Sequence, residues 1–563
     1  MSFESRLRAG LIVLLAGAGV VAWVSLNTSS NLNSQPIVLL DPVADRFVSI
    51  ENLSAPRSNP DAHEGMRRRQ ESAMLRSIVS TRGGPASGMG SEVLTPLGTA
   101  DQLLDGNEQH TDDGINNVTL VSEDAQSTFS VDVDTASYTI SRRKLREGTM
   151  PPEEAVRVEE FVNYFDYGYR PPSSGDDTPL SVYMEAAPSP VDPRRHILQV
   201  GLQGQVLDED SRRPARLTFL VDVSGSMDSF DKLPLAQQAL RELVRNLGPE
   251  DSVALATYAG RTAQLLPPTP ATRRDEIYGA IEQLRSGGGT AMASGIAMAY
   301  DLAQEAFVEG AENRVIVLSD GDANIGPSSH QQIVAAIQEH AKAGITLSTI
   351  GFGMGNYKDT MMEQLANKGD GNNFYIDSFS EARRVFGDDL SGTIQTIARD
   401  VKIQVEFDPQ AVYAYRLIGY ENRDIADRDF RNDAVDAGEV GSGHQVTALY
   451  ELTLADGYRS TETLATVRLR AKPPGPDAPS TEWVTAFPAA HVKSEVTDAS
   501  VDFRLALGSA LFAEKLRRSP HVAELSYAAV DELLSGTSGM DELRPLIRMA
   551  AALEQPTTLT VVR

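Results

Sequence analysis

The sequence contains no cysteine in its 563 residues. The absence of thiols excludes disulfides, thiolate zinc sites, iron–sulfur clusters and cysteine nucleophiles. Histidine is scarce as well, with 8 residues in the chain and no HExxH pattern. We therefore expect neither thiol chemistry nor a zinc site built on histidine.

Positive charge is also in short supply. Lysine and arginine total 51 against 78 aspartate and glutamate residues, which gives a formal net charge of −27. Nucleic acid repels such a chain unless its basic residues are segregated into a patch, so we expect no nucleic-acid partner. Nucleotide-binding loops are missing too. No Walker GK[ST] occurs, and the glycine-rich stretch 351–355 fails the GxGxxG pattern because Asn356 follows it.

The N-terminus has the pattern of an export or anchor signal. Arg6 and Arg8 precede an uncharged apolar run over residues 11–26. Its length lies between that of a signal-peptide core and the roughly 20 residues of a full membrane span. We expect a signal anchor within residues 1–30 that contacts the inner membrane and leaves the bulk of the chain in the periplasm. A cleaved signal peptide and secretion are the alternative.

The middle of the chain alternates between strands and helices. Near-continuous apolar strands at 217–221, 253–258, 315–318 and 345–352 are separated by amphipathic helices. This alternation predicts an α/β fold, a doubly wound parallel sheet covered by helices on both faces. Such domains bind ligands outside the carboxyl ends of their strands.

The flanking segments follow other patterns. Strands near 180–203 and strands within 400–486 lie on either side of the α/β domain, and we predict that they pair into one sandwich with that domain inserted between them. Helices end the chain. The expected organisation is a signal segment at 1–30, a disordered linker at 31–110, an α+β domain at 111–205, the α/β domain at 206–395 and a β-rich domain with C-terminal helices at 396–563.

Oxygen-bearing side chains follow three strands of the α/β domain. Asp222, Ser224 and Ser226 form a DxSxS motif, Thr290 follows three glycines, and Asp320 lies at the tip of another strand. All these loops fall on the same edge of a parallel sheet. Two carboxylates and three hydroxyls are hard donors, which suit Mg²⁺, or alternatively Mn²⁺ or Ca²⁺. Because Mg²⁺ takes about six ligands, one position is left for water or for a partner's carboxylate.

The α/β region resembles a von Willebrand factor type A domain, and the five residues match that family's metal-ion-dependent adhesion site. The resemblance implies that the two serines and the threonine coordinate the ion directly, while the aspartates lie near it. Residues from about 125 onward resemble bacterial exported proteins with a domain on each side of this module, and 130–138 and 151–157 resemble the preceding domain. Many such proteins look like lipoproteins, whereas this sequence has alanine at the position of the lipid-bearing cysteine.

These features predict an exported adhesion protein whose divalent ion is completed by an acidic side chain of a protein partner. No nucleophile or general base accompanies the five residues, so we expect no enzymatic activity. One alternative is a metal-dependent hydrolase using Asp132 or Asp134, because 132–135 resembles the DxDxT loop of haloacid-dehalogenase-like phosphatases. That chemistry needs a following α/β core, and helices follow instead. The other alternative is a purely structural scaffold of the cell envelope.

Overall fold

The computed structural model forms two compact units, Met1–Leu97 and Gly98–Arg563. In the first it describes four short strands. In the second it describes residues 110–554 except for 174, 209–210, 323–326, 354–358, 460–461, 476–477 and 537–539. Arg6 and Arg8 lie outside the described residues. So does most of the predicted linker, although β3 (Ile37–Leu40) and β4 (Phe47–Ile50) pair within it.

The N-terminal apolar run forms strands. β1 (Gly10–Leu14) pairs antiparallel with β2 (Val21–Ser25). Valine, isoleucine and tryptophan favour strands, and Gly17 and Gly19 interrupt the run between the two. Among the residues that the structure describes, no helix is long and apolar enough to cross a membrane. This finding overturns the predicted membrane anchor over residues 11–26, and the location in the cell envelope stays a prediction.

The α/β domain is built on a six-stranded sheet. Five strands run parallel, whereas the edge strand β11 is antiparallel to β10. β11 ends in Pro267, Pro268 and Pro270, and proline, which lacks a backbone N–H, is confined to sheet edges. The sheet therefore departs at one edge from the all-parallel prediction. Its order is β11 (Thr262–Pro270), β10 (Ser252–Tyr258), β9 (Ala215–Asp222), β12 (Glu312–Ser319), β13 (Ile345–Phe352) and β14 (Asn373–Ile376).

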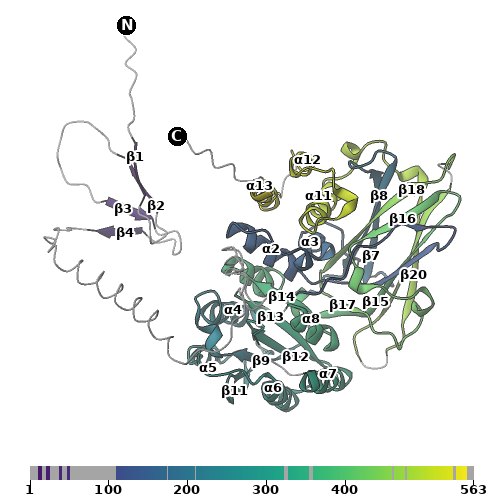
Figure 1. The fold of residues 1–563 in the computed structure, drawn as a ribbon. Coiled ribbons are helices and arrows are strands. Elements are labelled where there is room, and N and C mark those ends of the chain that lie inside the picture. The colour runs from purple at the N-terminus through teal and green to yellow at the C-terminus, as the bar shows by residue number, and fades with distance from the viewer. Residues whose placement is uncertain are drawn as a thin grey trace, which may run out of the picture. The chain divides into compact units, whose positions relative to one another are not determined.

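Helices cover both faces of this sheet, as predicted (Figure 1). Alternate residues of β9 point to opposite sides, so Phe219 and Val221 join one core and Leu220 joins the other. The first face is covered by α4 (Leu233–Asn246), α5 (Arg274–Ile281), α9 (Phe379–Arg383) and α10 (Leu390–Ile394). The second face is covered by α6 (Met292–Ala306), α7 (Pro327–Lys342) and α8 (Asp359–Lys368).

Strands from both sides of the α/β domain form one sandwich. β8 from the preceding segment pairs with β18 from the following one, and β6 pairs with β15. The α/β domain is therefore inserted into the sandwich, which confirms the predicted pairing. One sheet contains β5 (Thr119–Leu120), β16 (Val412–Ile418), β18 (Gln445–Leu454), β8 (Arg195–Gly204) and β7 (Leu180–Pro188). The other contains β17 (Gly438–Gly441), β15 (Thr396–Phe407), β19 (Thr463–Lys472) and β20 (Thr481–Pro488), with β6 (Gln126–Ser130) beside β15.

A helical layer packs on the sandwich. Helices from both ends of residues 110–554 share one apolar core with Ile197, Ile418 and Leu449 of the first sheet (Figure 1). The backbone of Arg157 is extended and separates a single turn at Glu153–Ala155 from α3 (Val158–Val162). The layer contains α2 (Ala136–Arg146), α3 (Val158–Val162), α11 (Val501–Leu516), α12 (Tyr527–Leu533) and α13 (Leu543–Glu554).

Candidate metal centre

Two acidic residues lie at the carboxyl edge of the central strands. β9 ends at Asp222, and Asp320 directly follows its parallel neighbour β12. Asp222 is 0% exposed and Asp320 is 1% exposed. Burying carboxylates is costly unless donors or cations compensate them. Two buried carboxylates at the ligand-binding edge of a sheet are therefore a candidate cation site.

The DxSxS loop folds back on its own aspartate. The Ser224 backbone N–H donates to Asp222 Oδ1 at 2.8 Å, and the Ser319 hydroxyl donates to Asp222 Oδ2 at 3.0 Å. The hydroxyls of Ser224 and Ser226 are hydrogen-bonded to each other, with their oxygens 3.0 Å apart. In an octahedral shell with bonds of 2.0–2.1 Å, neighbouring ligands are about 2.9 Å apart. The two hydroxyls are thus spaced like adjacent ligands of Mg²⁺.

The loop that carries Thr290 docks against the DxSxS loop. The Gly225 N–H donates to the Gly288 carbonyl at 3.1 Å, and the Gly287 N–H donates to the Val223 carbonyl at 2.8 Å. Gly288 has a φ of +92°, a region that favours glycine, so a larger residue there would strain the loop. Thr290 itself is half-buried. The loops that carry all five predicted residues therefore meet at one edge of the sheet.

A lysine that the sequence pattern did not indicate contacts one of the two aspartates. Lys232 Nζ donates to Asp320 Oδ2 at 2.8 Å across 88 positions of sequence. Burial raises the pKa of Asp222 above its ordinary value. The negative charge of Asp320 adds to that shift, and the hydrogen bonds from Ser224 and Ser319 oppose it. The two carboxylates thus differ, because Asp320 has a cationic partner in contact and Asp222 has only neutral donors.

The donor set fits a hard divalent cation. It combines two buried carboxylates with closely spaced hydroxyls and contains no nitrogen or sulfur ligand. The site has two acidic side chains, and the described part of the chain holds no group of three or more His, Asp and Glu side chains placed to hold a metal ion. Binding of a metal by Asp222, Ser224, Ser226, Thr290 and Asp320 stays a prediction.

The two aspartates of the hydrolase alternative lie elsewhere, between the sandwich and the α/β domain. Asp132 and Asp134 border a cavity of about 280 Å³. Arg423 contacts both, at 3.0 Å from Asp132 Oδ2 and 3.3 Å from Asp134 Oδ2. The Asn373 N–H of β14 also donates to Asp134 at 2.7 Å. Burial and the adjacent Asp132 raise the pKa of Asp134, while Arg423 opposes that shift. These contacts link the pair to Arg423 of the sandwich segment and to β14 of the α/β domain.

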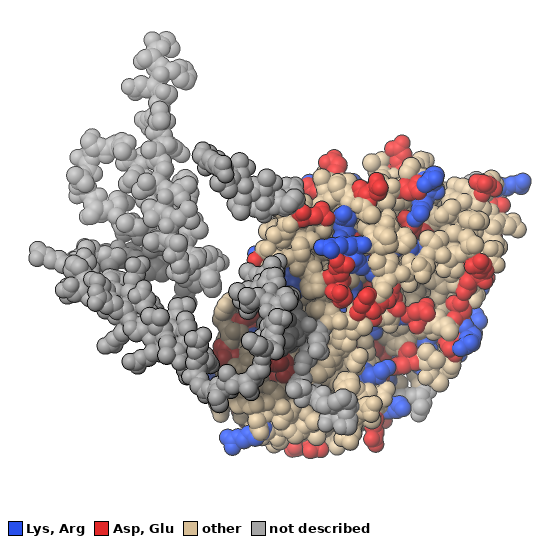
Figure 2. Space-filling model, in the orientation of Figure 1, with Lys and Arg blue, Asp and Glu red and all other residues tan. Residues whose placement is uncertain are grey.

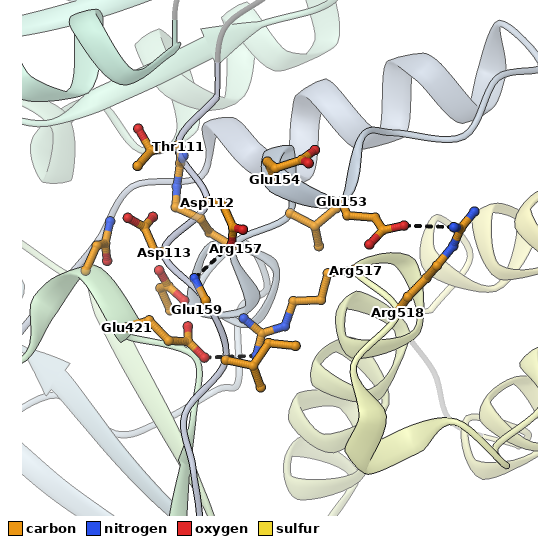
Figure 3. A pocket seen from close by; sticks show the side chains of 14 residues that line it. Thr111, Asp112, Asp113, Glu153, Glu154, Arg157, Glu159, Glu421, Arg517 and Arg518 are labelled. Atoms are coloured by element: carbon orange, nitrogen blue, oxygen red, sulfur yellow. Dashed lines mark hydrogen bonds and ion pairs between the residues drawn. The ribbon is translucent and has the colours of Figure 1, made fainter.

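A neighbouring cavity of about 340 Å³ is lined by acidic side chains and arginines (Figure 3). Arg517 pairs with Glu421 at 3.0 Å, and Arg518 pairs with Glu153 at 2.9 Å. Burial raises the pKa of Glu159 to about 7, and the negative charge of Glu421 adds to the shift. The cavity is therefore bordered by ion pairs that join Glu153 and Glu421 to the two arginines directly after α11.

The visible surface mixes the two signs of charge. Figure 2 shows lysine and arginine side chains interspersed with aspartate and glutamate over the described part of this face.

Family models match the three parts of the second unit. The model "von Willebrand factor" matches residues 105–199, "von Willebrand factor type A domain" matches 217–388, and "Uncharacterized protein YfbK, C-terminal" matches 392–552. The fold and these matches define a protein built around a von Willebrand factor type A domain. The uncharacterized protein YfbK of Escherichia coli is 36% identical over 449 residues, which cover 76% of this chain and 77% of that protein. The chain belongs to the YfbK family.

Other proteins are similar to the chain at lower identity. Human inter-alpha-trypsin inhibitor heavy chain H4 is 26% identical over 208 residues, which cover 35% of this chain and 21% of that protein. The uncharacterized protein sll0103 of Synechocystis is 27% identical over 217 residues, covering 38% and 50% of the two chains. Among solved structures, a von Willebrand factor type A protein from Catenulispora acidiphila is 17% identical with a TM-score of 0.43 and covers 67% of this chain and 91% of its own.

Proposed function

We propose that this protein is a non-enzymatic binding protein that takes up a divalent cation, Mg²⁺ in the first instance, and uses it to bind a protein partner. Asp222, Ser224, Ser226, Thr290 and Asp320 would hold the cation. The observation that carries the proposal is the 3.0 Å spacing of the Ser224 and Ser226 hydroxyls beside two buried carboxylates. Bound there, the ion would supply a Lewis-acidic position for an acidic side chain of the partner.

The surroundings of the site support a protein ligand. Ser226 is half-buried, so this hydroxyl lies at the boundary with solvent. Phe230, which follows in the same loop, is 85% exposed. Large aromatic side chains contribute strongly to protein interfaces when they become buried. A carboxylate at the ion and an apolar contact at Phe230 would together define the partner's surface.

Thermal unfolding of the full chain tests the proposal. A ligand that binds only the native state stabilises it by about 2.7 kcal/mol at a hundredfold excess over Kd. The unfolding midpoint should therefore rise on replacing EDTA with millimolar Mg²⁺. Asp222→Ala and Ser226→Ala should abolish the rise, and Asp275→Ala, at an exposed acid of α5, should keep it. An unchanged midpoint in the parent would refute metal binding by the free protein.

A further inference from the structure

Lys232 contacts the proposed metal site through one of its two acids. Its ammonium lies 2.8 Å from Asp320 Oδ2, and the side chains of Lys232 and Asp320 are 9% and 1% exposed. Charges shielded from water interact more strongly than the same charges at the surface. The positive charge of Lys232 therefore strongly affects the electrostatic potential at the two carboxylates.

Packing holds Lys232 in this position. Its aliphatic stem lies against the Gly353 backbone, where an added Cβ would come within 2.3 Å of Lys232 Cε. The Tyr375 hydroxyl donates to the Gly353 carbonyl at 2.8 Å. The preceding residue, Asp231, pairs with Arg143 of α2 at 2.5 Å. The ammonium is thus part of a packed arrangement that reaches into the flanking helical layer.

The lysine alters the charge balance at the carboxylates. Asp222 and Asp320 bring two negative charges, and Lys232 returns one positive charge. A divalent cation added to these three groups leaves an excess of one positive charge, which a single carboxylate neutralises. Without the lysine, the cation alone would balance the aspartates, and a further carboxylate would add uncompensated negative charge.

We propose that Lys232 makes cation binding at this site depend on an anionic ligand, so that the ion and a partner's carboxylate bind with positive cooperativity. This inference rests on the proposed function of the same site. The lysine would weaken the binding of the ion alone and strengthen the binding of a carboxylate to the ion-loaded site. Because such coupling is reciprocal, a carboxylate must tighten the binding of the ion by the same factor.

An adjacent unit charge sets the size of the effect. A neighbouring cation shifts the pKa of a carboxyl by about 1–3 units, which corresponds to about 10- to 1000-fold in affinity for a proton. A divalent ion feels the same charge at least as strongly. We therefore expect Lys232→Met, which keeps the apolar stem and removes the charge, to bind Mg²⁺ at least about tenfold more tightly than the parent.

Calorimetric titration of the full chain with Mg²⁺ tests the inference, with and without acetate as the carboxylate probe and with chloride at matched ionic strength. Acetate should tighten Mg²⁺ binding to the parent and have less effect on Lys232→Met. Lys232→Gln is the second neutral variant, with far-ultraviolet circular dichroism to establish folding. Lys342→Met, at an exposed lysine that ends α7, should behave like the parent.

The outcomes separate the inference from the proposed function. If the parent and both neutral variants bind Mg²⁺ equally, or if the variants bind it more weakly, the inference is overturned while the metal site stands. If acetate leaves the affinity of the parent for Mg²⁺ unchanged, the inference is also overturned. If no protein in the series binds Mg²⁺ with or without acetate, the proposed function fails and the inference fails with it.

Discussion

Arg142 joins three parts of the molecule, and its removal should be costly. This arginine of α2 makes two hydrogen bonds to Asp377, at 2.5 and 2.8 Å, and contacts Glu381 of α9 at 2.8 Å. It also contacts Glu542, which directly precedes α13, at 2.5 Å. The side chains of Arg142, Asp377 and Glu381 are 4%, 3% and 2% exposed. Arg142→Met would keep the apolar stem but leave Asp377 buried without its cation, whereas Glu381 would keep its ion pair with Arg384.

Breaking a buried ion pair by removing one partner costs about 3–5 kcal/mol. We expect Arg142→Met to lower the free energy of unfolding by that amount in urea titrations of the full chain, followed by circular dichroism. Arg146→Met is the matched control, because Arg146 belongs to the same helix, is 48% exposed and lies 3.7 Å from Glu542. The control should change stability by less than about 0.5 kcal/mol. A loss below about 1 kcal/mol for Arg142→Met, or equal losses for the two variants, would refute the reasoning.

Two further predictions concern a buried acid and two helical glycines. Burial raises the pKa of Glu159 to about 7 from 4.5, so its contribution to stability is complete below pH 4.5 and is lost as the pH rises through 7. The unfolding free energy should fall less between pH 5 and 8 in Glu159→Gln than in the parent, by up to about 3 kcal/mol. The same pH dependence in both proteins would contradict this prediction. In α6, a Cβ added at Gly295 would lie 2.8 Å from Tyr258 Cβ. A Cβ added at Gly279 in α5 would have no neighbouring atom within 4 Å. In the same urea assay, Gly295→Ala should therefore lower the free energy of unfolding by about 1–3 kcal/mol. Gly279→Ala should raise it by up to about 1 kcal/mol. Equal effects of the two substitutions would contradict the packing argument.

The position of the site could be predicted because it depends on local patterns. Apolar strands alternating with amphipathic helices indicate which strand ends share an edge of the sheet, and the DxSxS motif follows directly on one of them. The insertion into a sandwich was predictable for a similar reason, since strand-rich segments flank the α/β pattern. In both cases the information lies in periodicity, and periodicity is set by which face of each element becomes buried.

Other features depend on long-range contacts that no local pattern encodes. Lys232 meets Asp320 across 88 positions, and either residue alone is compatible with a solvated surface charge. The edge strand β11 was not predicted, because prolines are rare in strands, although an edge position tolerates them. The apolar run at 11–26 is uncharged and follows two arginines, which favoured an anchor although the run is shorter than a full membrane span. Its glycines and β-branched residues are also compatible with the paired strands β1 and β2.

The most direct test of the central claim is an anomalous difference map from crystals of the full chain grown with Mn²⁺. We predict a peak within about 2.0–2.3 Å of the Ser224 and Ser226 hydroxyl oxygens, at the edge of the sheet that Asp222 and Asp320 share. A map that has no peak at this edge at saturating Mn²⁺, or whose peaks lie only on other carboxylates, would contradict the account.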